Sequence, residues 1–178
     1  FAVEENLFKY HAACYLTHAG IDALKKLKED HNLKVDQVER IEQFVPNTHF
    51  SVCNIAEPET GLEVKFSMRH TAAIALADVD TGSLNSYSDD IAKRPDLIKL
   101  RDRVTIIDKP FNSRMQSEVV VHLKDKGAVH QFSDAGVPES NLDKQETKLI
   151  RKFNSLVTPI FGEEASQSIL DKCLKLET

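Results

Sequence analysis

The segment KFSMRH, residues 65–70, places cationic side chains around the expected start of a helix. Ser67 is a good N-cap, so Arg69 and His70 fall in the first turn and Lys65 lies just before it. A helix N-terminus carries partial positive charge, so cations there are unfavourable unless an anion lies opposite them. Free N–H groups beside Lys and Arg suit a carboxylate or a phosphate. We interpret the segment as an anion site; the alternative is a solvated Arg69 and a neutral core His70.

A second cluster, KYHAACYLTH, gathers side chains that can take part in chemistry, namely Lys9, Tyr10, His11, Cys14, Tyr15 and His18. Their spacing does not match zinc-ligand patterns and no second cluster completes a site, so no metal is expected. Cys14 and His18 stand four residues apart, as a nucleophile and its base can on one helical face, although such pairs are usually incidental. The alternative to a reactive site is that Tyr10, Cys14 and Tyr15 pack in the core.

Hydrophobic periodicity, caps and turn residues predict the elements that position these clusters. Helices are expected over 18–31, with Thr17 as N-cap, and over 67–78, 89–94 and 95–103. A strand is expected over 38–45, where the spacing also fits a helix but β-branched residues before Val45-Pro46 favour a strand. A second strand is expected over 104–110, and a hairpin over 117–132 turns at Asp125, Lys126 and Gly127. Neither βαβ alternation nor a Gly-rich phosphate loop occurs, so the predicted fold class is α+β with an antiparallel sheet and packed helices rather than a dinucleotide fold.

The composition changes after residue 139. Ser140 is expected to open a helix whose apolar stripe is made of Leu142, Leu149, Phe153 and Leu156. Pro159 and Gly162 are expected to break the chain before a second helix over 163–177. We therefore predict an α+β domain at 1–139 and a helical segment at 140–178, whose apolar stripe needs a partner surface.

Composition limits the classes of partner. The chain of 178 residues carries a formal charge of −5 without a basic stripe, so nucleic acid is not an expected partner. No apolar run approaches the roughly 20 residues that span a bilayer, so no membrane is expected either. Three widely spaced cysteines suggest free thiols in a reducing compartment, by default the cytoplasm. The start FAVEENLF suggests a sequence cut from a longer one; a lost transit peptide would direct it to mitochondria.

Four segments together resemble the carboxyl-terminal half of the MmgE/PrpD family: FKYHAACYLTHAGIDALKKL, VERIEQFV, EPETGLEVKFSMRHTAAIALAD and SYSDDIAKRPDLIKLRDRVTI. The resemblance covers most of residues 8–175 in the same order. Its more specific parts are the pattern Lys-x4-Cys/His…His-x2-Ile-Asp and the Lys-Phe-Ser segment. The family includes 2-methylcitrate dehydratase, cis-aconitate decarboxylase and iminodisuccinate epimerase.

The resemblance implies a two-domain arrangement. Family members have a large all-helical domain, built from an N-terminal part and the last helices, and a smaller α+β lid, with the active site in the cleft between them. Residues 1–139 then correspond to the lid and 140–178 to helices of the other domain. The absent N-terminal helical domain carries the family's catalytic histidines and acidic residues. Members are typically homodimers and need no cofactor.

The resemblance also implies roles for single residues. Lys9 matches a lid lysine that faces a substrate carboxylate, and Cys14 matches a position that is His in the decarboxylase branch and often Cys elsewhere. His70 matches a Tyr or His that reaches the pocket. His18 matches a common His that, like Ser67, supports the site from behind.

The chain departs from the family pattern at two positions. Ala12 stands where many relatives have Pro, and this replacement is expected to loosen the loop that carries Lys9. Arg69 stands where Pro or Gln is common, which adds a positive charge. Cys14 in place of His speaks against the decarboxylase branch.

Reactions of this family remove a proton next to a carboxylate and then lose water or CO2, or return the proton to the other face. We therefore expect the carboxyl-terminal part of an enzyme acting on a small polycarboxylate, with His70 and Cys14 catalytic and Lys9, Lys65 and Arg69 binding substrate. Half of a cleft is expected to be inactive alone. The alternative is a non-catalytic lid-like module that binds an acidic metabolite or a protein partner. The sequence leaves the substrate and the reaction outcome open.

Overall fold

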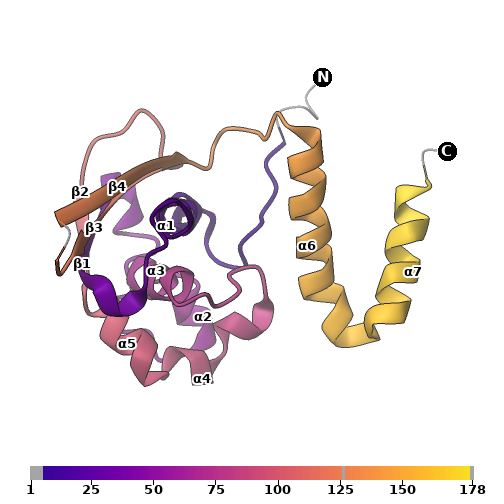
Figure 1. Cartoon of the computed structure of the whole chain (residues 1–178), viewed down its shortest axis with the longest axis horizontal. Helices are drawn as coiled ribbons and strands as arrows, with labels where there is room; N and C mark the ends of the chain where they lie inside the picture. The colour runs from indigo at the N-terminus through magenta and orange to yellow at the C-terminus, as the bar shows by residue number, and fades with distance from the viewer. Residues whose placement is uncertain (1–5, 126, 177–178) are drawn as a thin grey trace.

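The computed structural model describes residues 6–125 and 127–176; Lys126 of the predicted turn lies outside them. The strands are β1 (Val38–Val45), β2 (Val104–Asp108), β3 (Gln116–Leu123) and β4 (Gly127–Asp134). The helices are α1 (His18–His31), α2 (Gly61–Val64), α3 (Met68–Leu76), α4 (Asp89–Ala92), α5 (Pro95–Arg101), α6 (Leu142–Phe161) and α7 (Glu163–Leu174). Short 3-10 turns occur at Tyr15–Thr17, Val35–Gln37, Asn47–His49 and Leu84–Tyr87. This is the predicted α+β fold class (Figure 1).

The strands form one sheet in the order β2-β1-β3-β4. The pairs β1–β3 and β3–β4 are antiparallel, as predicted, but β1 and β2 are parallel, with Ile41 opposite Val104. The reason is the connection between them. Helices α2 to α5 separate β1 from β2 and carry the chain back to the same end of the sheet, which a tight hairpin cannot do.

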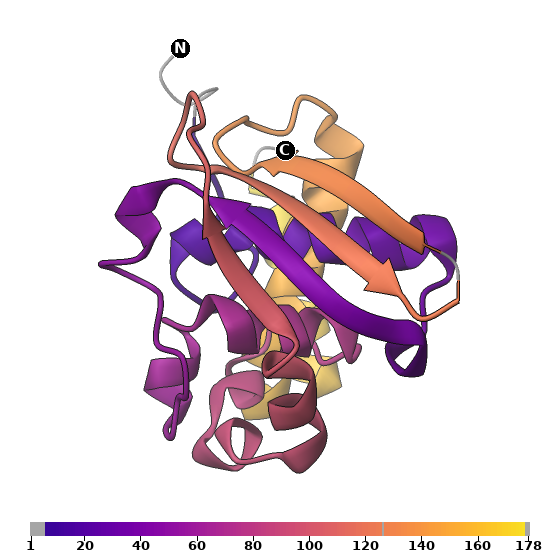
Figure 2. The same ribbon diagram turned by 90° about the vertical axis from the view of Figure 1, so that its left-hand side faces the viewer.

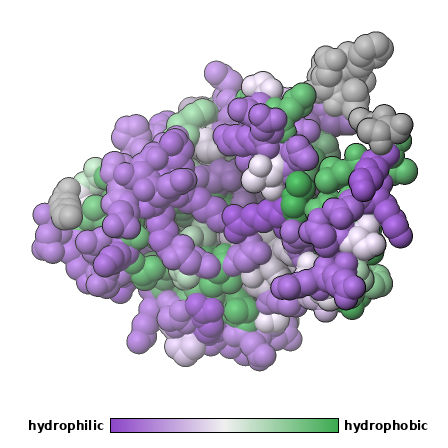
Figure 3. All heavy atoms as spheres, turned by 45° about the vertical axis from the view of Figure 1, so that its right-hand side comes forward, coloured by the Kyte–Doolittle hydropathy of each residue, from purple (hydrophilic) through white to green (hydrophobic). Residues whose placement is uncertain are grey.

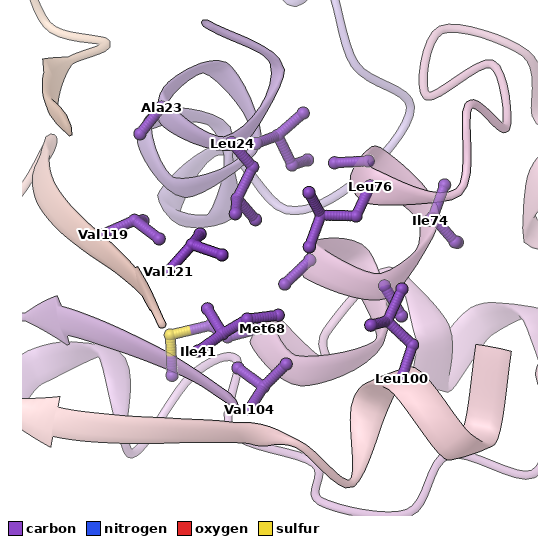
Figure 4. Close-up of a cluster of buried hydrophobic side chains, with 14 of the residues drawn as sticks. Ala23, Leu24, Ile41, Met68, Ile74, Leu76, Leu100, Val104, Val119 and Val121 are labelled. Atoms are coloured by element: carbon purple, nitrogen blue, oxygen red, sulfur yellow. The ribbon is translucent and has the colours of Figure 1, made fainter. Parts of the chain in front are cut away.

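Helices α1 and α3 cover one face of the sheet, and in Figure 2 they lie behind the strands. Their fully buried side chains, such as Leu24 and Leu76, point toward those of Ile41, Val119 and Val121 from the strands (Figure 4). Each such side chain stabilises the fold by about 1.5–3 kcal/mol when it leaves water. This core fixes the start of α1 and of α3, where both predicted clusters lie.

The two helix starts differ in how they are capped. The Ser67 side chain accepts a hydrogen bond from the His70 N–H at 3.1 Å, so α3 begins where the sequence predicts. The Thr17 hydroxyl instead donates to the Cys14 carbonyl at 2.8 Å and caps nothing. A 3-10 turn runs directly into α1, so that helix starts without a side-chain cap.

Helix α6 departs from the prediction at both ends. Asn141, rather than Ser140, is the N-cap, and its side chain accepts from the Lys144 N–H at 3.0 Å. Pro159 lies inside the helix instead of ending it, because a proline so near the last turn removes only one late hydrogen bond. The helix ends at Gly162, whose φ of 79° few other residues adopt.

Helices α6 and α7 diverge from Gly162, beside the rest of the molecule (Figure 1). No described side chain of α6 is buried, and its polar face holds it in place: Lys152 donates to the Gly82 carbonyl at 2.8 Å. Exposed apolar residues on this pair include Leu142, Ile160, Phe161 and Leu174. Figure 3 shows hydrophobic residues at the surface on this side. Within the described ranges, no helix has the length and apolar character needed to cross a bilayer.

Gly61 allows α2 to lie against the backbone of the 3-10 turn before α4. A Cβ at this position would stand 1.9 Å from the Tyr87 carbonyl oxygen. We expect Gly61→Ala to lower the free energy of unfolding by about 1–3 kcal/mol, as overpacking does. Leu62→Ala, at a neighbouring exposed position, should stay within about 0.5 kcal/mol. Urea unfolding of both variants measures this; equal stabilities would contradict the close contact.

Candidate functional site

The segment before α1 joins the two predicted clusters. The Cys14 N–H donates to the Lys65 carbonyl at 2.9 Å, and the Ala12 N–H donates to the Thr81 carbonyl at the same distance. Because residues 6–14 form no helix or strand, these two backbone hydrogen bonds determine where their side chains lie. The structure thus brings Cys14 beside Lys65, and Lys9 near enough for its charge to act on the Cys14 thiol.

Three lysines, Lys9, Lys65 and Lys152, form a group that we call the lysine cluster. Burial lowers the pKa of Lys152, nearby Asp80 opposes that fall, and the positive charges of Lys9 and Lys65 lower it further. The Lys65 ammonium also lies 5.9 Å from the centre of the Tyr87 ring. Lys152 thus experiences repulsion from both Lys9 and Lys65, and an anion beside it would relieve that repulsion.

The Cys14 thiol adjoins the lysine cluster and is half-buried. The hydrogen bond that it receives from the Cys53 thiol lowers the pKa of Cys14 to about 6. Burial opposes this shift, whereas the Leu16 N–H and the charge of Lys9 favour it. The lowered pKa favours the thiolate of Cys14, which is the reactive form of cysteine.

A cavity of about 780 Å³ adjoins the same segment, between α1, residues 80–82, the end of β4 and α6, and Lys152 of the lysine cluster is part of its lining. Its wall holds a hydrogen-bonded network in which His11 contacts the Thr81 hydroxyl at 2.7 Å and the Asp22 carboxylate at 3.0 Å. Lys25 donates to the same hydroxyl at 2.7 Å. A neutral His11 that donates to Asp22 leaves its other nitrogen to accept the Thr81 hydroxyl, so every bond is satisfied.

Asp22 orients this imidazole as a charged carboxylate. Partial burial works against the ionised form, but the hydrogen bond from His11 and the surrounding positive charges bring the pKa of Asp22 below its ordinary value. A carboxylate that holds an imidazole in one tautomer is an arrangement suited to proton transfer.

His18 also lines the cavity but is held neutral. Its ring stacks on Tyr15, with centroids 4.5 Å apart, and meets His11 edge-on. Burial lowers the pKa of His18 to about 3; the charge of Lys9 reinforces this shift and Asp22 opposes it. Among the described residues its Nε2 has no hydrogen-bond partner.

The residues at the start of α3 do not join the lysine cluster. Arg69 donates to the Asn54 side chain at 3.0 Å, and the helix N–H groups of Met68 and His70 are bonded to Cys53 and Ser67. These bonds occupy donors that the sequence interpretation offered to an anion. Ser67 serves as the cap of its own helix.

His70 lies wholly in the core, toward the side of α4 and α5. Burial lowers the pKa of His70 to about 4; the nearby Ile91 backbone opposes this, and the charges of Arg101 and Arg94 reinforce it. No hydrogen bond of normal geometry reaches either ring nitrogen within the described structure. A neutral core histidine, the alternative that the sequence left open, is therefore the state that this packing favours.

Sequence reasoning missed Lys152, Asp22 and Thr81. In the sequence, Lys152 is one of several charged residues on an amphipathic helix, and no neighbouring residue indicates that it lies near Lys9. The spacing of His11 and Asp22 has no periodic meaning. As for metals, no set of three or more His, Cys, Asp or Glu side chains in the described ranges is placed to hold an ion.

The family model described as the MmgE/PrpD C-terminal domain matches residues 11–176. The chain belongs to the MmgE/PrpD family. No curated protein matches it closely enough to name a more specific activity. The match includes Cys14, Lys65 and Lys152, whereas Lys9 lies just before it. The lysine cluster and the adjacent cavity are the candidate functional surfaces of this MmgE/PrpD chain.

The burial of His70 predicts a loss of stability in acid. In the unfolded chain a histidine titrates near pH 6.5, whereas the pKa of folded His70 is about 4. As the pH falls between these values the unfolded chain binds a proton that the folded chain does not, so the free energy of unfolding falls. His70 accounts for at most about 3 kcal/mol of this loss, and His18 acts in the same direction.

Urea unfolding at about pH 7 and about pH 5 measures this loss. His70→Phe, which keeps an aromatic ring but cannot bind the proton, should lose less stability between the two pH values than the unchanged chain. An equal loss in both would mean that His70 is not held neutral in the core.

The Cys14 thiolate predicts an alkylation rate that rises near pH 6 and levels off above about pH 7, because the pKa of Cys14 is about 6. An ordinary thiol, with a pKa of about 8.5, continues to gain reactivity beyond that range. Peptide mass spectrometry after iodoacetamide treatment measures the rate at Cys14. In Cys53→Ala the profile should move to higher pH; a Cys14 profile like that of an ordinary thiol would contradict the lowered pKa.

Proposed function

We propose that the chain is the carboxyl-terminal part of a cofactor-independent MmgE/PrpD enzyme that acts on a small polycarboxylate. The reaction removes a proton next to a carboxylate and then loses water or CO2, or returns the proton to the opposite face. The observation that carries the proposal is the lysine cluster, in which Lys9, Lys65 and Lys152 share one region beside the Cys14 thiolate.

The chemistry gives each of these groups a task. Substrate carboxylates take the place between the ammonium groups, which relieves the repulsion among them. As the proton leaves, negative charge spreads onto the carboxylate oxygens, and fixed cations stabilise that charge. Cys14, with a pKa of about 6, is suited to accept or return a proton near neutral pH. Direct contact of His70 and Arg69 with substrate stays a prediction.

A second part of the proposal concerns the partner that completes the site. We propose that residues 1–139 form the lid and that α6 and α7, within 140–178, pack against an N-terminal helical domain. The exposed apolar residues of α6 and α7 and the description of the matching model as a C-terminal domain support this. We also propose, from the family resemblance, that the complete enzyme is a homodimer of the cytoplasm or the mitochondria, and that the chain alone binds substrate without turning it over.

Proton NMR of citrate, 2-methylcitrate and cis-aconitate in D2O with this chain tests the proposal. We expect line broadening of the polycarboxylates without turnover. Lys9→Ala and Lys65→Ala should each weaken binding at least about tenfold, since a charged hydrogen bond is worth about 1.5–3 kcal/mol. Lys124→Ala, at the exposed turn after β3, is the matched control and should bind as the unchanged chain does.

The other outcomes are equally informative. Olefinic product or loss of a proton signal next to a carboxylate would show that this chain holds a complete site. Binding that Lys124→Ala weakens as much as Lys9→Ala does would reduce the cluster to general charge attraction. Absence of broadening would contradict a carboxylate site here and favour the alternative, a non-catalytic module for a protein partner.

A further inference from the structure

Two cysteines distant in the sequence lie together in the fold. The Cys14 N–H donates to the Lys65 carbonyl, and the Met68 N–H donates to the Cys53 carbonyl, at 2.9 and 3.0 Å. Both cysteines are therefore tied to the same short segment, 65–68, which leads into α3. Cys14 packs against the core cluster that contains Cys53. These backbone bonds hold both cysteines next to one segment, and the side-chain hydrogen bond between Cys53 and Cys14 brings their sulfur atoms together.

The two thiols are in unequal surroundings. Cys53 is completely buried, and its S–H has the His49 carbonyl at 3.6 Å and the Cys14 sulfur as acceptors. The hydrogen bond to Cys14, together with burial, raises the pKa of Cys53. Cys14 is half-buried and has Lys9 beside it. A solvent-reachable thiolate next to a protonated, sheltered thiol is the arrangement of a redox-sensitive pair.

We propose that Cys14 is an oxidation site for hydroperoxides and that Cys53 resolves the product into a reversible internal disulfide. The pair thus forms a redox switch at the edge of the lysine cluster, a role separate from any turnover of a polycarboxylate.

The chemistry takes place in two balanced steps. The Cys14 thiolate attacks the nearer peroxide oxygen, the O–O bond breaks, and the leaving alkoxide or hydroxide takes up a proton. Sulfur is oxidised to a sulfenic acid, Cys14–SOH, and the peroxide is reduced to an alcohol or to water. The Cys53 sulfur then attacks the Cys14 sulfur, the S–O bond breaks, and the hydroxyl leaves as water with the Cys53 proton. A dithiol reverses the result by thiol–disulfide exchange.

Closure of the disulfide would change the site in two ways. It removes the thiolate charge beside Lys9, and it takes away the group that we propose to transfer a proton. It also ties the segment before α1 covalently to the loop before α2, which raises the cost of opening that part of the chain. Peroxide would therefore change the candidate site through oxidation of the Cys14–Cys53 pair.

The test is a peptide map of the reduced 178-residue chain after treatment with hydrogen peroxide, alkylation of remaining thiols and digestion without reductant. We expect a Cys14–Cys53 linked peptide whose mass is lower by two hydrogen atoms than the sum of its parts, and which dithiothreitol removes. Cys173, exposed on α7, is the internal control and should remain largely alkylatable at the same peroxide dose.

Two variants sharpen the result. Cys173→Ser should leave the linkage intact. In Cys53→Ala, peroxide should oxidise Cys14 to sulfinic acid, because no thiol is present to form the disulfide. The unchanged chain is decisive even if Cys53→Ala folds poorly. Absence of the linked peptide when Cys173 is already oxidised, or equal sulfinic acid at Cys14 with and without Cys53, would overturn the proposal.

Discussion

The hydrogen bond from the Cys14 N–H to the Lys65 carbonyl is the contact on which the site depends. The chain before α1 has no regular structure, so its place is set by a few backbone bonds to loops that the core holds. Those loops are firm because α1 and α3 bury Leu24, Leu76 and their neighbours against the sheet. Packing in the core thus determines where Lys9 and the Cys14 thiol are exposed to solvent.

Charge is distributed in two opposite ways around this bond. Near the surface, the charge of Lys9 favours the Cys14 thiolate, and the charges of Lys9 and Lys65 lower the pKa of Lys152. In the interior, burial keeps His18 and His70 neutral, because an unpaired buried charge costs far more than a neutral ring. The same chain therefore combines a lysine charge beside the Cys14 thiol with a core that resists protonation at ordinary pH.

Helix α6 links the site to the family's architecture. Its polar face contributes Lys152 and the contact to Gly82, while Leu142 and Ile160 remain exposed. A helix that contributes a side chain to the site and leaves apolar surface uncovered is suited to stand between two domains. Under the proposed function, the lysine cluster would lie at the edge where a second domain closes over a ligand. The thiol pair lies at the same edge, so oxidation and ligand binding would act on one region.

The sequence by itself determined the elements whose signals are local. Strand 38–45, the start of α3 at Ser67 and the hairpin turn at Gly127 follow from β-branched residues, a capping side chain and a glycine that permits a positive φ, each confined to a few neighbouring residues. It also determined the family, because the motifs and their order along the chain can be recognised without knowledge of tertiary contacts.

Only the tertiary structure decided the rest. The parallel pairing of β2 with β1, the approach of Lys152 to Lys9 and the contact between Cys14 and Cys53 join residues far apart in the chain. Periodicity shows which face of a helix is apolar but not which distant segment covers it. For the same reason the sequence placed His70 in the first turn of α3, while burial on the side of α4 and α5 determined that its ring is neutral and in the core.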